Sequence, residues 1–95
     1  MLQIETRHLK IINSILSKYP YTFYAYGSRV KGTGRKYSDL DLCYREEIPW
    51  NVLSHLQEDL EESDLPFKVD LIFWELMGSE FQKLIKNDLV PIKEV

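Results

Sequence analysis

Two aspartates separated by one residue, Asp39 and Asp41, carry the clearest chemical signal in the sequence. They stand at the start of a short alternating apolar stretch, and in an extended chain residues i and i+2 project from the same face. Two ionised carboxylates held this close repel each other, and a divalent cation removes the repulsion. Because a few hard oxygen ligands with room for water and phosphate suit Mg²⁺ better than Ca²⁺, we expect a Mg²⁺ site here.

A third aspartate, Asp70, lies in the middle of a later strand-like stretch, between Val69 and Leu71. If this strand is a neighbour of the first in the right register, Asp70 completes a cluster of three carboxylates. Such a cluster can hold two metal ions about 3.5–4 Å apart for in-line phosphoryl transfer. Two plainer interpretations stay open: Asp70 on an exposed strand face, and the Ser38–Asp41 stretch as a simple turn.

Upstream of the aspartates, Gly27 and Ser28 directly follow an aromatic apolar stretch and precede a possible helix start. Backbone N–H groups and a hydroxyl at such a turn suit phosphate oxygens, and glycine lets the backbone come close. Four basic residues lie between this turn and the aspartates: Arg29, Lys31, Arg35 and Lys36. They suit a triphosphate, although a solvated basic loop explains them too. The GxxxxGK[ST] pattern of a Walker A loop is absent.

Alternating helices and strands are expected to position these residues. Apolar spacings of three and four predict a helix capped by Thr6 and stopped by Pro20, and another that begins at Pro49. Short apolar stretches predict strands over 21–26, 40–44 and 67–74. A last helix, capped by Ser79, is expected to bury Phe81, Leu84 and Ile85, with Leu89 as a further candidate. The tail 90–95 can add an edge strand.

This order of elements predicts an α/β (α+β) fold, in which helices pack on a small mixed sheet of three to four strands. A chain of 95 residues is expected to form one domain over residues 1–95. Cys43 is expected to fill a buried strand position, and Trp50 and Trp74 to anchor the core. The acidic run 58–64 is expected to be only a solvated helix face.

Composition excludes several classes of protein. The formal net charge of −3 makes direct nucleic-acid binding unexpected, because such domains are usually basic. No window of 18 apolar residues and no signal-peptide pattern occurs, so we expect a cytoplasmic protein without membrane contact. A single cysteine excludes an intramolecular disulfide.

The arrangement Gly27-Ser28, nine residues, then Ser38-Asp39-Leu40-Asp41-Leu42 resembles the signature of the DNA polymerase β-like nucleotidyltransferase superfamily. The short length resembles its minimal nucleotidyltransferase branch. The resemblance implies a polymerase β-like fold and two catalytic Mg²⁺ ions. It assigns the metal-binding and catalytic roles to three residues: Asp39, Asp41 and Asp70. Of these, Asp70 would also act as, or assist, the base for the attacking hydroxyl.

The same resemblance implies that ATP is a substrate and that the glycine-serine turn binds its β- and γ-phosphates. The implied nucleotide-binding residues are Gly27, Ser28, Arg29, Lys31 and Ser38. Arginine is frequent at the position of Arg29 in this branch. Many members carry a second arginine where this sequence has Lys31.

The acceptor of the nucleotide is inferred from what surrounds the motif. Polymerases and tRNA-modifying members of the superfamily carry extra domains that grip nucleic acid, so this short acidic chain points to a protein acceptor. Minimal nucleotidyltransferases are commonly encoded beside a helical HEPN ribonuclease toxin and act as its antitoxin, some by transferring AMP to a tyrosine. Our leading hypothesis is an Mg²⁺-dependent adenylyltransferase of such a partner. The alternatives are a catalytically weak module that inhibits its partner by binding, and a small-molecule adenylyltransferase.

Overall fold

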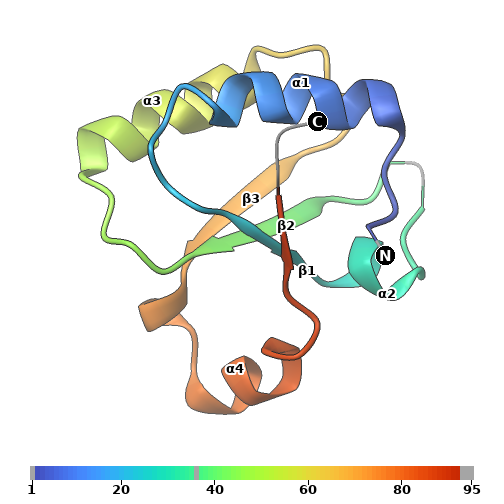
Figure 1. The fold of residues 1–95 in the computed structure, drawn as a ribbon, viewed down its shortest axis with the longest axis vertical. Helices are drawn as coiled ribbons and strands as arrows, with labels where there is room; N and C mark the ends of the chain where they lie inside the picture. Colours follow the sequence, from blue (N-terminus) through green and yellow to red (C-terminus); the bar gives the residue numbers. More distant parts are fainter. Residues whose placement is uncertain (1, 36, 93–95) are drawn as a thin grey trace.

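A mixed sheet organises the chain in the computed structural model, which describes residues 2–35 and 37–92 (Figure 1). The helices are α1 (Thr6–Leu16), α2 (Ser28–Lys31), α3 (Trp50–Glu61) and α4 (Ser79–Ile85), with a 3₁₀ turn η1 (Trp74–Leu76). The strands are β1 (Tyr24–Tyr26), β2 (Leu40–Tyr44), β3 (Val69–Phe73) and β4 (Val90–Pro91). Within the described ranges they form one four-stranded sheet of order β3-β2-β1-β4. Only the β2–β3 pair is parallel, so the predicted mixed α/β fold is confirmed.

The two faces of this sheet have different roles. Helices α1 and α3 cover one face and enclose the main core (Figure 1). The buried residues of this core include Ile12, Leu16, Phe23, Ala25, Leu40, Leu42, Leu56, Leu60 and Val69. Because side chains alternate along a strand, Asp41 and Asp70 project from the opposite face. A smaller cluster on that face joins Tyr26 and Cys43 to Met77 and Ile85 of the η1–α4 segment.

Most predicted elements are present, with corrected ends. Strand 40–44 is confirmed, whereas the strand predicted over 21–26 is limited to residues 24–26, because only these pair with β2. Neither Thr6 nor Ser79 caps its helix: each is the first helical residue, after Glu5 and Gly78, and neither N-cap residue makes a side-chain capping hydrogen bond. The edge strand predicted over 90–95 is observed at residues 90–91, and residues 93–95 lie outside the described ranges.

Several predicted core residues lie on the surface. Trp50, Phe81 and Leu84 are exposed, so their predicted burial is wrong. Trp50 is the first residue of α3, and within α4 Ile85 is the buried residue. Trp74 is half-buried beneath the Arg45 guanidinium, 5.1 Å from the ring centre. Cys43 is fully buried as predicted, and burial raises the pKa of its thiol.

Candidate active site

Two of the three predicted aspartates, Asp41 and Asp70, are neighbours on the open sheet face, and Asp39 directly precedes the strand that carries Asp41. In the parallel β2–β3 pair Asp41 stands beside Asp70, so the two strands are adjacent and in the register that brings these carboxylates together. Asp39 directly precedes β2 and is exposed, while Asp41 and Asp70 are half-buried. Across the antiparallel β1–β2 pair, Tyr26 stands opposite Asp41. The sheet therefore brings Tyr26, Asp41 and Asp70 side by side in what we call the aspartate row, and Asp39 lies at its rim.

Gly27 connects this row to the turn that follows β1. Its backbone has φ 84° and ψ −156°, a region that residues with a side chain rarely adopt. A Cβ added there would lie 2.6 Å from Oδ2 of Asp41. The Asp41 carboxylate therefore packs directly against the Gly27 backbone, in space that only glycine leaves open. The turn and the first aspartate strand thus form one continuous site.

The electrostatics of the row are those of crowded carboxylates. Burial raises the pKa of Asp41, and the charges of Asp70 and then Asp39 raise it further. Burial, helped by the charges of Asp41, Cys43 and Asp70, raises the pKa of the Tyr26 phenol to about 12, so Tyr26 remains protonated at neutral pH. Lys68 partly compensates the negative charge, with its Nζ 3.3 Å from Oδ1 of Asp70.

The chemistry of these residues fits a hard divalent cation. All the donors are carboxylate oxygens, which Mg²⁺ prefers, and their mutual repulsion is what a cation relieves. Across residues 2–35 and 37–92, however, no three carboxylate, imidazole or thiol groups lie close enough to form a ready-made metal site. The arrangement is a close pair, Asp41 and Asp70, with Asp39 next in the chain before β2. Residues 39, 41 and 70 are the ones that would hold a cation.

Arg29, one of the predicted nucleotide-binding residues, is buried inside the protein. Its side chain is 4% exposed, and its Nε and Nη1 donate hydrogen bonds of 2.9 Å to the carbonyls of Ser38 and Gln3. The guanidinium also lies 4.1 Å from the centre of the Phe67 ring. These contacts join α2 to the residue before Asp39 and to the segment before α1. Arg29 therefore holds the turn and the aspartate strand in register.

The remaining predicted nucleotide-binding residues surround the turn in different ways. Ser28 is half-buried at the first position of α2, and Lys31 is exposed at its last position. The Ser38 hydroxyl accepts a hydrogen bond from the Arg35 N–H at 2.8 Å, and so shapes the turn that leads into β2. Lys36, part of the predicted basic cluster, lies outside the described residues.

Sequence reasoning missed the role of Lys68. The signal for its contact was the i, i+2 spacing to Asp70, the same spacing that joins Asp39 to Asp41.

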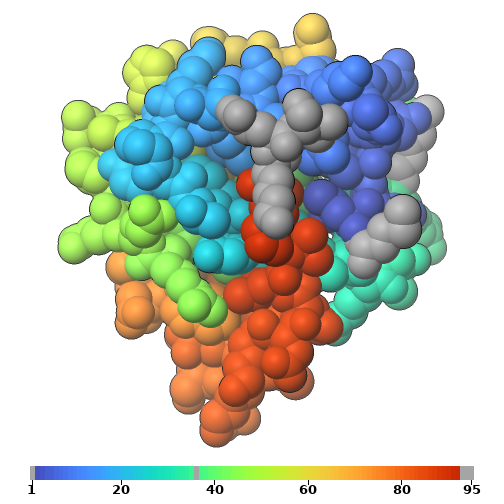
Figure 2. All heavy atoms as spheres, in the orientation of Figure 1, coloured from blue at the N-terminus to red at the C-terminus, as the bar shows by residue number. Residues whose placement is uncertain are grey.

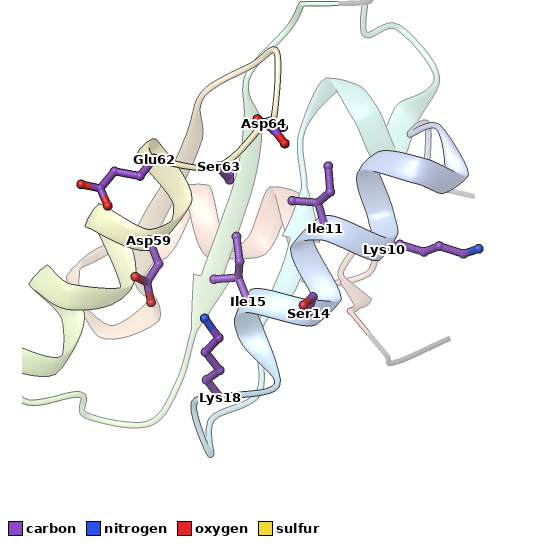
Figure 3. A pocket seen from close by; sticks show the side chains of 9 residues that line it. All are labelled: Lys10, Ile11, Ser14, Ile15, Lys18, Asp59, Glu62, Ser63 and Asp64. Carbon is purple, nitrogen blue, oxygen red and sulfur yellow. The ribbon is translucent and has the colours of Figure 1, made fainter.

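A groove of about 450 Å³ lies on the other side of the sheet, between α1 and the end of α3 (Figure 3). Its lining includes Lys10 of α1 and Lys18 just after this helix, with Asp59, Glu62 and Asp64 on the α3 side. The acidic run 58–64 was predicted to be only a solvated helix face, but its Asp59 accepts a 2.6 Å hydrogen bond from the Tyr19 hydroxyl. This groove is separated from the aspartates by the sheet.

No helix within the described ranges combines the length and the apolar composition needed to cross a membrane.

Comparison with known proteins agrees with this geometry. Residues 10–94 match the family described as polymerase beta, nucleotidyltransferase. The probable protein adenylyltransferase MntA of Haemophilus influenzae is 42% identical over 97 residues, an alignment that covers 98% of this chain and 85% of that relative. With the family match spanning nearly the whole chain and the aspartate row in place, this protein belongs to the polymerase β family of nucleotidyltransferases.

Proposed function

We propose that this nucleotidyltransferase moves AMP from ATP to a hydroxyl group of a partner protein, with Mg²⁺ as its cofactor. The observation that carries the reaction class is the placement of Asp41 beside Asp70 and against the Gly27 turn. The protein acceptor is supported by the relative in Haemophilus influenzae, which is named a probable protein adenylyltransferase.

In the proposed reaction the acceptor hydroxyl oxygen forms a bond to the α-phosphorus of ATP. The bond from that phosphorus to the oxygen bridging to the β-phosphate breaks, and pyrophosphate leaves. The hydroxyl proton passes to the Asp70 carboxylate, which acts as general base. Mg²⁺ held by Asp39, Asp41 and Asp70 would supply positive charge for the phosphate oxygens. Tyr26, protonated at neutral pH, offers a neutral donor beside them.

The proposed roles of the turn differ from residue to residue. Gly27 and Ser28 present backbone N–H groups at the start of α2, where phosphate oxygens are bound favourably. Lys31 is proposed to place a positive charge at the end of α2 for the phosphates. Ser38 is proposed to shape the turn over residues 35–38 that leads into β2. Arg29 acts as a positioning residue, since two of its guanidinium nitrogens donate to backbone carbonyls inside the protein.

For the acceptor we propose a HEPN-type ribonuclease toxin encoded by the neighbouring gene, with this chain as its antitoxin. The test is incubation of the purified neighbouring gene product with ATP labelled at the α-phosphate, Mg²⁺ and this protein. The wild type should label the partner, whereas Asp41→Asn and Asp70→Asn should not. Asp64→Asn, an exposed carboxylate remote from the site, is the matched control and should label normally. An unlabelled partner would refute the proposal.

One observation favours a second candidate, a module that inhibits its partner by binding alone. The described residues do not form a ready-made metal site. In that case Asp41→Asn would still neutralise the partner's ribonuclease activity at a one-to-one ratio. Under the main proposal, neutralisation depends on AMP transfer, so Asp41→Asn should fail to neutralise the partner.

A further inference from the structure

The η1–α4 segment carries three exposed large apolar side chains, Leu76, Phe81 and Leu84, which we call together the α4 patch. Their side chains are 80%, 44% and 71% exposed. Single exposed leucines are ordinary on a protein surface, but three large apolar residues within nine positions are less so. Figure 2 shows this segment, in orange to red, projecting from the body of the molecule at the end away from α1 and α3.

The α4 patch borders the aspartate row. The Phe81 ring contacts the Tyr26 ring edge-to-face, with centroids 5.9 Å apart. Tyr26 is in turn the cross-strand partner of Asp41. Leu84 lies one helical turn beyond Phe81, and residues spaced by three share a helix face. The patch therefore lies one side chain away from the cross-strand partner of Asp41.

Buried side chains of the η1–α4 segment attach it to the sheet. Met77 and Ile85 are buried against Tyr26 and Cys43. Gln82 Nε2 donates a 2.7 Å hydrogen bond to the Trp74 carbonyl, which ties α4 to η1. The exposed apolar side chains are thus presented on an ordered support, and a partner that covers them does not have to order the backbone first.

The size of a protein interface shows which occupant the patch suits. A typical interface covers about 800 Å² on each partner, a surface roughly 30 Å across. The whole molecule measures 33 × 31 × 21 Å. A protein that delivers a hydroxyl to Asp41 and Asp70 therefore also covers the adjoining α4 surface. ATP is much smaller than such an interface, and can occupy the aspartate row and the Gly27 turn without reaching Leu76 or Leu84.

We propose that the α4 patch is the docking surface for the protein acceptor, whose own apolar surface packs on Leu76, Phe81 and Leu84. This inference rests on the proposed function and adds to it the surface that recognises the acceptor. It separates the two substrates in space: the aspartate row and the turn take ATP, and the patch takes the protein.

The test uses the variants Leu76→Ser and Leu84→Ser, singly and together, with the purified product of the neighbouring gene as acceptor. Trp50→Ser is the matched control, because Trp50 is 79% exposed but lies on α3, across the sheet from α4 (Figure 1). At saturating ATP, the double variant should lose about 10-fold or more in kcat/KM for the acceptor, since apolar anchors dominate such interfaces. Each single variant should lose a few-fold, and Trp50→Ser less than two-fold.

Two further measurements keep the outcomes distinct. Affinity for a non-hydrolysable ATP analogue with Mg²⁺ should stay within two-fold of wild type, and thermal melting should confirm that each variant is folded. Acceptor kcat/KM within two-fold of wild type, or an equal loss in Trp50→Ser, would overturn the docking surface alone. A parallel fall in ATP affinity would overturn it by assigning the patch to the nucleotide. Absence of labelling by the wild type would overturn the proposed function, and the docking surface with it.

Discussion

Replacing Gly27 with alanine tests the contact on which the site is built. The backbone at φ 84° and ψ −156° lies in a region reserved almost entirely for glycine, so alanine there costs about 1–3 kcal/mol. The added Cβ also requires the Asp41 carboxylate to retreat by about 0.8 Å, from 2.6 Å to an ordinary 3.4 Å contact. A displacement of about 1 Å in an active site lowers the rate by roughly 10²-fold. We expect Gly27→Ala to melt about 5–20 °C lower and to transfer AMP about 100-fold more slowly.

Gly32→Ala is the matched control for this variant. Gly32 also has a positive φ, 78°, but nothing lies within 4 Å of the Cβ that alanine would add. It should therefore lose about 1–2 kcal/mol of stability and keep its activity at temperatures where it is folded. Stability is measured by thermal or urea unfolding, and activity by AMP transfer per folded molecule.

A double variant separates backbone strain from the contact with Asp41. In an Asp41→Ala background the clash is absent, so Gly27→Ala should cost less than it does in the wild type, by about 0.5–3 kcal/mol. Equal activity losses in Gly27→Ala and Gly32→Ala would refute the reasoning. Full activity in Gly27→Ala would refute it as well.

Three further predictions concern charged groups at or beside the site. The pKa of Asp41 is raised in the folded protein, so its ionisation opposes folding. The contribution of this group to the stability of the metal-free protein should fall as pH rises above the ordinary aspartate pKa of about 3.9, and Asp41→Asn should melt higher at neutral pH by a margin that shrinks in acid. A margin that does not change with pH would contradict this. Arg29→Lys should lose about 1.5–3 kcal/mol in urea unfolding, because an ammonium cannot replace both guanidinium hydrogen bonds; an unchanged midpoint would argue against the positioning role. Lys68→Ala should lower the Mg²⁺ concentration at half-maximal rate by about 2- to 5-fold, since the ammonium beside Asp70 competes with a cation; a raised requirement in a Mg²⁺ titration would show that Lys68 assists instead.

The strands of the sheet and the face on which Asp41 and Asp70 lie could be predicted from the alternation of apolar and polar residues in the sequence. Alternation over 40–44 placed Asp41 on the face opposite Leu40 and Leu42, and the same rule applied to β3 placed Asp70 on that face too. Their adjacency depended on β2 and β3 pairing in parallel. No local signal specifies such a pairing, which the structure provides.

What could not be predicted depends on contacts between distant segments. In the sequence, an arginine next to a phosphate-binding turn is expected to bind the nucleotide. Only the fold shows that Arg29 contacts the Phe67 ring and the backbone carbonyls of residues 3 and 38. Trp50 was expected in the core because tryptophan is large and apolar, but at the first position of α3 its side chain is exposed. Burial depends on which side of an element meets the rest of the chain, and that is decided by tertiary packing.

The most direct test of the central claim follows the phosphates of ATP. Two parallel reactions contain this protein, Mg²⁺ and the purified product of the neighbouring gene, one with ATP labelled at the α-phosphate and one with the γ-phosphate labelled. Attack at the α-phosphorus predicts that the α label becomes covalently attached to the partner protein and that the γ label is released in pyrophosphate. Both events should be absent in Asp41→Asn. Transfer of the γ label to the partner, or release of inorganic phosphate in place of pyrophosphate, would contradict nucleotidyl transfer at this site.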